Sequence, residues 1–314
     1  MLNDDPSVAT IRRMAEAHRS LGVARLLPTL ITDTPDKTVA AVEAAVRAAD
    51  VPGVAGLHLE GPHLSVARKG AHEARLIRRM EADDLSFLLA AAERLPVLMI
   101  TVAPESVTVE QVATLARAGV LVSLGHSDAD FDTCQRYFAA GARCATHLFN
   151  AMSQIGNRQP GLVGAALANG AVSAGLIADG VHVHPEVMRL AWLGKRAPGR
   201  IFLVSDAMAV AGTAMASFEL GGRRINRADG QLRLEDGTLA GADLDLTTAV
   251  SVLVRRVGVA PEDALAAVTR VPAELCGLGP YGLAVGVTRL EDVIRIGGDY
   301  ARATPVSVPE AVRA

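Results

Sequence analysis

The feature that most constrains the fold is a regular alternation of short apolar runs with longer amphipathic runs. Strand-helix repetition at this spacing predicts a parallel β-sheet with right-handed crossovers, and therefore an α/β fold. Seven apolar runs are predicted to be strands, one fewer than a closed eight-stranded barrel needs. They are Ala24–Thr32, Val54–Leu59, Val97–Val102, Val120–Leu124, Cys144–Leu148, Val172–Ala178 and Ile201–Ser205.

Amphipathic runs and one Gly- and Arg-rich stretch occupy the remaining chain. Helices are predicted at Ser7–Leu21, Asp36–Ala49, Glu73–Arg94, Val109–Ala118, Phe131–Ala140, Pro185–Leu193, Leu244–Val257 and Pro261–Cys276. The stretch Phe218–Leu239 has alternating apolar residues and is predicted to be a hairpin excursion. Weak strands are expected in the tail, Leu283–Ala314.

Composition excludes several classes of protein. Half of the 314 residues are hydrophobic but only 3% are aromatic, so the core must consist of Ala, Val and Leu, which suits helices packed on parallel strands. A net charge of −3 gives no electrostatic footprint for nucleic acid or an anionic membrane. The amino terminus has no signal-peptide pattern. Polar residues interrupt the one uncharged stretch near membrane length, Gly161–Ala178, so a transmembrane span is not expected. Three cysteines without metal-ligand spacing indicate reduced thiols and a cytoplasmic protein.

Five polar side chains stand at the carboxyl ends of different predicted strands: Glu60, His126, His147, His182 and Asp206. A parallel barrel builds its site at this end of its strands. One carboxylate and two imidazoles form a sound ligand set for a divalent transition metal with an open position. We therefore predict that Glu60, His126 and His147 bind a metal. Each residue alone has a structural alternative, a loop-capping carboxylate or a core histidine.

The remaining candidates surround this predicted metal site. Asp206 is predicted to take a proton from water and return it to a leaving amine, with a helix cap as the alternative. His72 and His182 are expected to contact a substrate carbonyl or hydroxyl. Polar residues after the fifth strand, Asn150, Gln154, Asn157 and Arg158, are predicted to bind a polar or anionic ligand. Arg158 would be a fork donor to phosphate, unless it is a solvated surface side chain.

Seven motifs in this order resemble those of the N-acetylglucosamine-6-phosphate deacetylase family. They lie between about Asp4 and Gly277: Gly56-Leu-His-Leu-Glu-Gly-Pro62, Lys69-Gly-Ala-His72, Thr101-Val-Ala-Pro-Glu105, Ser123-Leu-Gly-His-Ser127, Ala145-Thr-His-Leu-Phe-Asn-Ala-Met152, Gly175-Leu-Ile-Ala-Asp-Gly-Val-His-Val183 and Val204-Ser-Asp-Ala207. The resemblance implies a (β/α)₈ TIM-type barrel of the metal-dependent amidohydrolase kind. It implies hydrolysis of N-acetylglucosamine 6-phosphate to glucosamine 6-phosphate and acetate.

The resemblance also implies roles for individual residues. Glu60, His126 and His147 would bind one divalent metal ion, zinc first, with iron, cobalt or manganese as alternatives. Asp206 would be the general base and acid. The amino-sugar phosphate would be bound by His72, Asn150, Ala151 through its backbone, Arg158 and His182. Arg158 would reach the neighbouring subunit's site, so a homodimer is implied.

The sequence departs from the family pattern at its ends. Family members have an earlier barrel strand and a small β-sandwich, so the first strand and most of the accessory sandwich are expected to be missing. The predicted division is a barrel at 1–280 and a remnant of sandwich strands at 281–314. A second metal is not expected, because the family's His-x-His ligands precede Met1. The alternatives are a truncated, weakly active or inactive remnant of such an enzyme, or an amidohydrolase for another N-acyl substrate.

Overall fold

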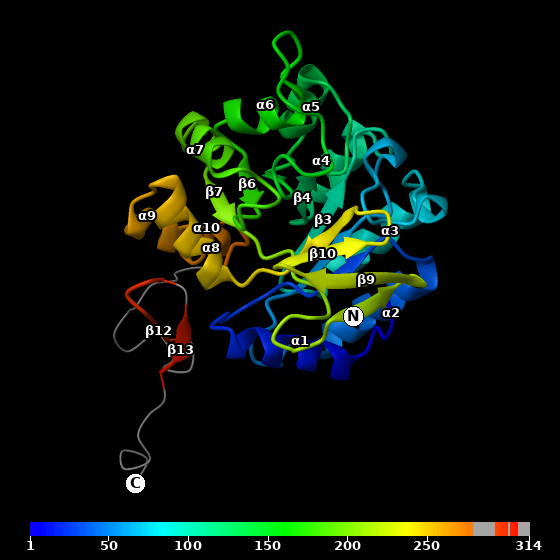
Figure 1. Ribbon diagram of the computed structural model, residues 1–314. Coiled ribbons are helices and arrows are strands. Elements are labelled where there is room, and N and C mark those ends of the chain that lie inside the picture. The colour runs from blue at the N-terminus through cyan, green and yellow to red at the C-terminus, as the bar shows by residue number, and fades with distance from the viewer. Residues whose placement is uncertain (279–292, 301, 307–314) are drawn as a thin grey trace.

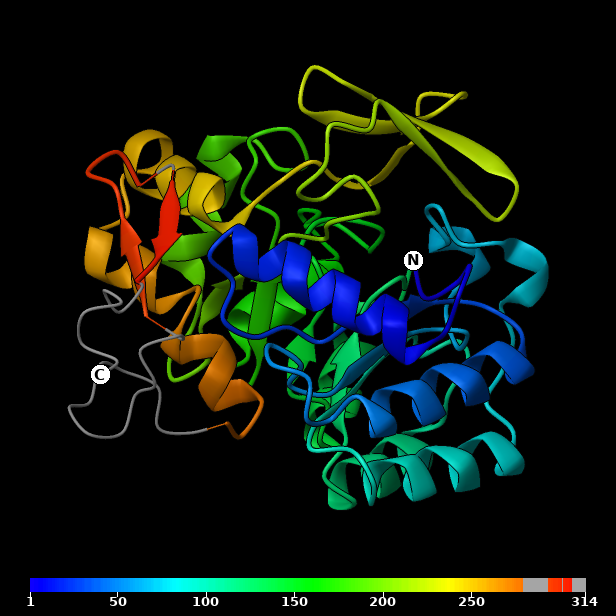
Figure 2. The same cartoon turned by 90° about the horizontal axis from the view of Figure 1, so that it is seen from below.

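The computed structural model describes residues 1–278, 293–300 and 302–306. Its centre is one parallel sheet of seven strands, whose order in the sheet is their order in the chain (Figure 1). The sheet curls, and helices surround it on the outside, as an amidohydrolase-type barrel requires (Figures 1 and 2). The strands are β1 (Thr29–Ile31), β2 (Leu57–Glu60), β3 (Leu98–Val102), β4 (Leu121–Leu124), β5 (Cys144–Ala145), β6 (Ser173–Leu176) and β7 (Ile201–Leu203).

Burial on both faces explains why these strands are continuous apolar runs. All residues of β2 and β4 are buried, and Leu59 pairs with Leu30 on one side and Ile100 on the other. Strands of a parallel sheet covered by helices need apolar side chains on both faces. The seven strands predicted from the sequence are therefore confirmed, each within its predicted run or one residue beyond it. Within the described residues, β1 and β7 are the outer strands of this sheet.

Most helices begin where a capping residue precedes an amphipathic run. Ser7, Thr34, Thr108, Asp130 and Asp245 each accept a hydrogen bond from a backbone N–H of the first turn. Such caps satisfy donors that have no partner inside the helix. The helices are α1 (Val8–Ser20), α2 (Pro35–Arg47), α3 (Ala82–Ala92), α4 (Val109–Arg117), α5 (Phe131–Ala139), α6 (Gly161–Ala168), α7 (Pro185–Gly194), α8 (Leu246–Val252), α9 (Pro261–Ala266) and α10 (Arg270–Leu275).

Two predicted helices were too long. The helix predicted over Glu73–Arg94 begins only at Ala82, because Glu81 and Asp84 form a capping box there. The preceding residues form a loop with two short 3₁₀ turns, η1 (Val66–Arg68) and η2 (Ala74–Leu76). The helix predicted over Pro261–Cys276 is split into α9 and α10 around Thr269. Pro272 lacks an N–H and fits only in the first turn of a helix, so a new helix begins near it.

The segment after β7 is larger than the predicted hairpin. It forms a four-stranded antiparallel sheet, seen in yellow-green beside the barrel in Figure 2. Gly221-Gly222 and Asp229-Gly230 form two-residue turns with positive φ at every position, as tight hairpins require. The sheet has its own core, which includes Phe218 and Ile225. Its strands are β8 (Ser217–Leu220), β9 (Arg223–Ala228), β10 (Gln231–Leu234) and β11 (Leu239–Ala242).

The end of the described chain contains a small antiparallel pair, β12 (Ile294–Ile296) and β13 (Ala303–Pro305). The predicted boundary near residue 280 stays a prediction, because residues 279–292 and 307–314 lie outside the described residues. After α8 the helix widens into a π-helical turn, η3 (Leu253–Val257), which Gly258 ends with φ 83°. None of the helices described is long and apolar enough to cross a membrane.

Candidate functional site

The candidate residues lie at the carboxyl ends of the parallel strands. Glu60 is the last residue of β2, while His126, His147 and Asp206 follow β4, β5 and β7 within three residues. The backbone of these last three is left-handed, with φ of 48°, 28° and 48°. Non-glycine residues adopt this conformation at a cost of about 1–3 kcal/mol each, and such residues gather at functional sites. Each strand therefore turns sharply at the residue whose side chain enters the site.

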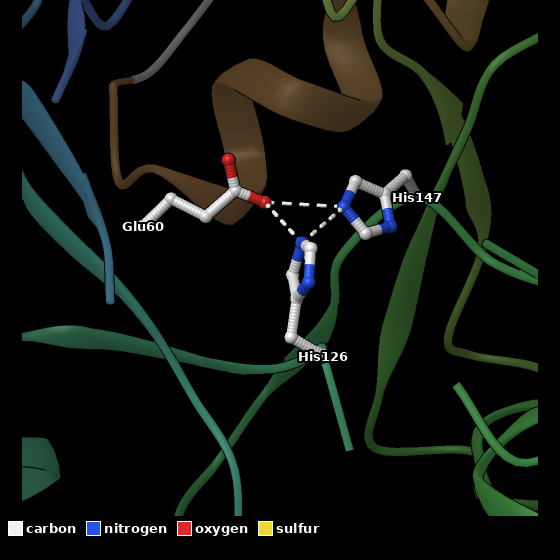
Figure 3. Close-up of side chains that lie close together, drawn as sticks. All are labelled: Glu60, His126 and His147. Carbon is white, nitrogen blue, oxygen red and sulfur yellow. Dashed lines mark hydrogen bonds and ion pairs between the residues drawn. The ribbon is translucent and has the colours of Figure 1, made fainter. Parts of the chain in front are cut away.

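Glu60, His126 and His147 form a compact buried cluster (Figure 3). Glu60 Oε1 and the Nε2 atoms of the two imidazoles are 3.1 Å apart in each of the three pairs. The three side chains are 7%, 5% and 8% exposed, respectively. Ligands about 2.0–2.1 Å from a tetrahedral zinc ion would be roughly 3.3 Å apart, so the triangle has nearly the size that the metal needs.

Backbone carbonyls fix the imidazoles in the form that binds metal. Nδ1–H of His126 donates to the carbonyl oxygen of Arg68 at 2.8 Å, and Nδ1–H of His147 donates to that of Asn150 at 3.2 Å. A carbonyl only accepts, so the proton of each neutral ring lies on Nδ1 and the lone pair lies on Nε2. Outer hydrogen bonds of this kind orient metal-binding histidines. The donor set, its spacing and its outer partners all fit a divalent transition metal.

The electrostatics of the cluster favour a shared cation. Burial alone would raise the pKa of Glu60, but hydrogen bonds to His126 and His147 hold it well below its usual range. Burial alone would lower the pKa of His147, but the hydrogen bond and charge of Glu60 raise it to about 9. The protein thus stabilises a carboxylate here and draws positive charge to it. A divalent ion can supply that charge in place of protons.

Asp206 follows β7 and interacts through its charge with His147 and Glu60, and His182, which follows β6, interacts in the same way with Asp206. Desolvation raises the pKa of Asp206 above its usual range, opposed by the charge of His147. Glu60 raises this pKa further, and the charge of His182 lowers it. A carboxyl with a raised pKa beside the cluster is suited to proton transfer.

His72 packs directly on the cluster. Its ring meets that of His126 edge to face, with centroids 4.4 Å apart. Its Nδ1 is 2.8 Å from Oγ1 of Thr32, the residue after β1. Burial and the nearby His126 lower the pKa of His72 to about 3, so this imidazole is neutral. The structure therefore brings His72 next to the clustered residues, and its role in binding substrate stays a prediction.

The loop after β5 divides its predicted residues between two places. Asn150 orients His147 through its carbonyl, while its side chain bonds to Leu148 O at 3.3 Å. Ala151 has φ 48° and lies beside Gly70, across from His126. Residues 154–159 are exposed, and Arg158 is among them, with no hydrogen bond or ion pair to any described residue. The loop carrying Arg158 projects from the body of the molecule (Figure 1, green, top).

Sequence reasoning missed the partners that orient the site. Thr32 and Asp179 each hold an imidazole through Nδ1, and the backbone carbonyl of Arg68 holds a third. Asp179 had a signal, since it follows an apolar strand and precedes His182 by three residues. Arg68 and Thr32 had none, because a backbone carbonyl is common to all residues and an isolated threonine is unremarkable.

The comparisons with known proteins agree with this geometry. Residues 2–287 match the amidohydrolase family. The chain is 41% identical to the N-acetylgalactosamine-6-phosphate deacetylase of Shewanella sp. (strain ANA-3), over 87% of this chain and 69% of that protein. It is 33% identical to the human N-acetylglucosamine-6-phosphate deacetylase, over 98% of this chain and 78% of that protein.

Solved structures give the same relationship. The crystal structure of N-acetylglucosamine-6-phosphate deacetylase from Pasteurella multocida superposes with a TM-score of 0.89 at 33% identity, covering 96% of this chain and 79% of that one. The enzyme of that name from Thermotoga maritima superposes with a TM-score of 0.77 at 31% identity, covering 85% and 72%. With its strand order and its clustered site, the chain belongs to the amidohydrolase family, and among its members it is similar to these deacetylases.

Proposed function

We propose that this protein is a metal-dependent deacetylase that hydrolyses the acetamide of N-acetylglucosamine 6-phosphate in amino-sugar catabolism. The observation that carries the proposal is the buried Glu60–His126–His147 triangle, at the strand ends of a fold shared with deacetylases of this specificity. The 41% identity to a deacetylase for the galactosamine epimer favours N-acetylgalactosamine 6-phosphate as a second candidate substrate.

The chemistry follows from the placement of the polar groups. Glu60, His126 and His147 would hold the ion, zinc first, with iron, cobalt or manganese as alternatives. When bound, a divalent ion supplies Lewis acidity for the amide carbonyl and for water. The Asp206 carboxylate takes the proton from the attacking water and delivers it to the nitrogen of the leaving amine. His72, Asn150, Ala151 and His182 would bind the sugar and its acetamide.

Acetate release on both epimers tests this function. We expect the purified protein to release one acetate per free amine from at least one of the two sugar phosphates, and a chelator to abolish the release. Metal content without acetate from either epimer would favour an inactive remnant of such an enzyme. Acetate or another acid from a different N-acyl compound alone would favour another amidohydrolase activity.

Arg158 is proposed to bind the phosphate of the substrate, in the neighbouring subunit of a homodimer. The supporting observations are its exposure, its projecting loop and its lack of a partner among the described residues. Arg158→Ala removes a charged hydrogen bond worth about 1.5–3 kcal/mol, and a 1.4 kcal/mol change is roughly tenfold in affinity. We therefore expect the KM for the phosphorylated sugar to rise at least ~10-fold. The same variant should scarcely change hydrolysis of unphosphorylated N-acetylglucosamine.

Arg117→Ala is the matched control for this prediction. Arg117 is an exposed arginine in the last turn of α4, at the opposite end of the strands. Steady-state kinetics on both sugars should leave this control unchanged. Equal losses on both sugars in Arg158→Ala would make Arg158 a structural residue. Sedimentation of wild type gives the oligomeric state, and a monomer that binds the phosphorylated sugar normally would contradict the shared site.

A further inference from the structure

The turn after β6 contains a buried carboxylate-imidazole pair. Asp179 Oδ2 and His182 Nδ1 are 2.6 Å apart, and each side chain is 7% exposed. The other carboxylate oxygen, Oδ1, accepts the backbone N–H groups of Val181 and His182, both at 2.8 Å. Both oxygens of Asp179 are therefore engaged, and the carboxylate cannot turn away without losing three hydrogen bonds.

The pair defines which nitrogen of His182 carries a proton. Burial alone would raise the pKa of Asp179, but the hydrogen bonds from His182 and from Val181 N–H leave it below its usual range. An ionised carboxylate only accepts, so Nδ1 of His182 must carry a proton. Nε2 is then the atom available to a ligand. The charge of His182 lowers the pKa of Asp206, so the imidazole interacts through space with the proposed proton-transfer group.

The backbone between Asp179 and His182 has a conformation that few residues adopt. Gly180 has φ 78°, and a Cβ there would lie 2.5 Å from an Arg256 guanidinium nitrogen. Arg256 belongs to η3, the π-helical turn that packs on α7. The left-handed φ is the reason a glycine fits where the chain turns between Asp179 and His182, and the guanidinium of Arg256 lies against that turn.

We infer that Asp179 is a positioning residue, which holds His182 as its Nδ1–H form with Nε2 directed to the bound substrate. The expected effect on catalysis rests on the proposed deacetylase function. The effect on the tautomer of His182 does not depend on that function. Loss of the partner that orients a metal-binding imidazole commonly costs about 10–100-fold, and we expect a loss of the same order for an imidazole that contacts the substrate. Asp179 acts through His182, so its removal should matter only while His182 is present.

A double-mutant cycle tests the role in kinetics. Asp179→Asn keeps an oxygen for the two backbone N–H groups but not the charged acceptor for Nδ1–H. We expect it to lower kcat/KM about 10–100-fold with unchanged metal content. In a His182→Gln background the same change should cost less than about twofold, because the orienting contact is already lost. Additive losses would show that Asp179 supports the fold alone and would overturn the inference. Asp130→Asn, which alters the cap of α5, is the control carboxylate.

Nitrogen-15 NMR of the imidazoles tests the same role without any substrate. His182→Gln assigns the His182 signals, and wild type should show a protonated Nδ1 coupled to Asp179. Asp179→Asn should shift these signals towards the ordinary mixture of tautomers, in which Nε2–H predominates. A wild-type ring protonated only at Nε2 would overturn the inference. If wild type hydrolyses neither sugar phosphate but shows protonated Nδ1, the proposed function fails and the positioning role stands.

Discussion

Asp206→Asn is expected to lower kcat by about 10²–10⁴-fold, the range for loss of a positioned proton-transfer group. The amide of asparagine has nearly the shape of the carboxylate but cannot take a proton from water. Asp206 lies outside the Glu60–His126–His147 triangle, so metal content should stay near that of wild type. KM should change little, because Asp206 moves a proton and does not hold the sugar. The variant thus separates chemistry from binding.

The measurement combines single-turnover acetate release with metal analysis of the same preparation. Asp236→Asn is the control, since Asp236 is an exposed carboxylate in the turn between β10 and β11, where it accepts the backbone N–H of Thr238. It should keep wild-type kcat. An Asp206→Asn enzyme that retains more than about a tenth of wild-type kcat would remove Asp206 from the proton-transfer step.

The barrel strands could be predicted because each of them is a short, continuous apolar run. A parallel strand covered by helices on both faces must be apolar throughout, and runs such as Leu121–Leu124 and Ile201–Leu203 have this pattern. The polar residue that ends each run then marks the site. Glu60, His126 and His147 could be placed together from this rule, before any distance between them was known.

The four-stranded sheet was underestimated although its signals are present. Gly221-Gly222 and Asp229-Gly230 are two-residue hairpin turns, separated by a strand length. Alternation is clear in β8 and β10 but is diluted in β9, where Arg223 and Arg227 lie half-buried on the same face as Ile225 and Arg224 is exposed on the other face. Because arginines stand at both inward and outward positions, the period of two is weak over β9, and the sequence predicts only one hairpin.

The side-chain hydrogen bonds inside the barrel could not be predicted, because they join residues of different strands whose register the sequence does not define. Below the triangle, the hydroxyl of Thr146 lies 2.7 Å from that of Thr101 and 2.6 Å from that of Ser123. Thr101 also lies 2.8 Å from His58 Nε2. Each residue alone looks like a polar interruption of an apolar strand. Their meeting depends on strand register, which only the folded sheet defines.

Removing one ligand of the triangle is expected to empty the metal site. Glu60→Gln replaces the anionic donor with a neutral amide, and His147→Ala removes a donor altogether. Changes to outer partners of metal sites already cost about 10–100-fold in affinity, and losing one of three direct ligands should cost more. We therefore expect less than about a tenth of an equivalent of metal per chain, against about one in wild type. Acetate release should fall to the level of chelated wild type. His184→Ala is the matched control, because His184 is an exposed imidazole that caps α7 outside the cluster.

The pH dependence of metal affinity is a second measurement that tests the same ligand assignment. In the metal-free protein the pKa of His147 is raised to about 9, chiefly because the hydrogen bond to Glu60 outweighs burial. At neutral pH this imidazole therefore carries a proton that a metal ion must displace. Metal affinity in wild type should then rise roughly tenfold per pH unit below pH 9, by release of one proton. Competition titrations with a chelating dye at pH 6, 7 and 8 measure this slope.

The Glu60→Gln variant removes the partner that raises the pKa of His147, so burial lowers that pKa. We therefore expect the metal affinity to fall and its dependence on pH to flatten. Full metal occupancy in both ligand variants, or a slope unchanged in Glu60→Gln, would mean that the metal is held elsewhere.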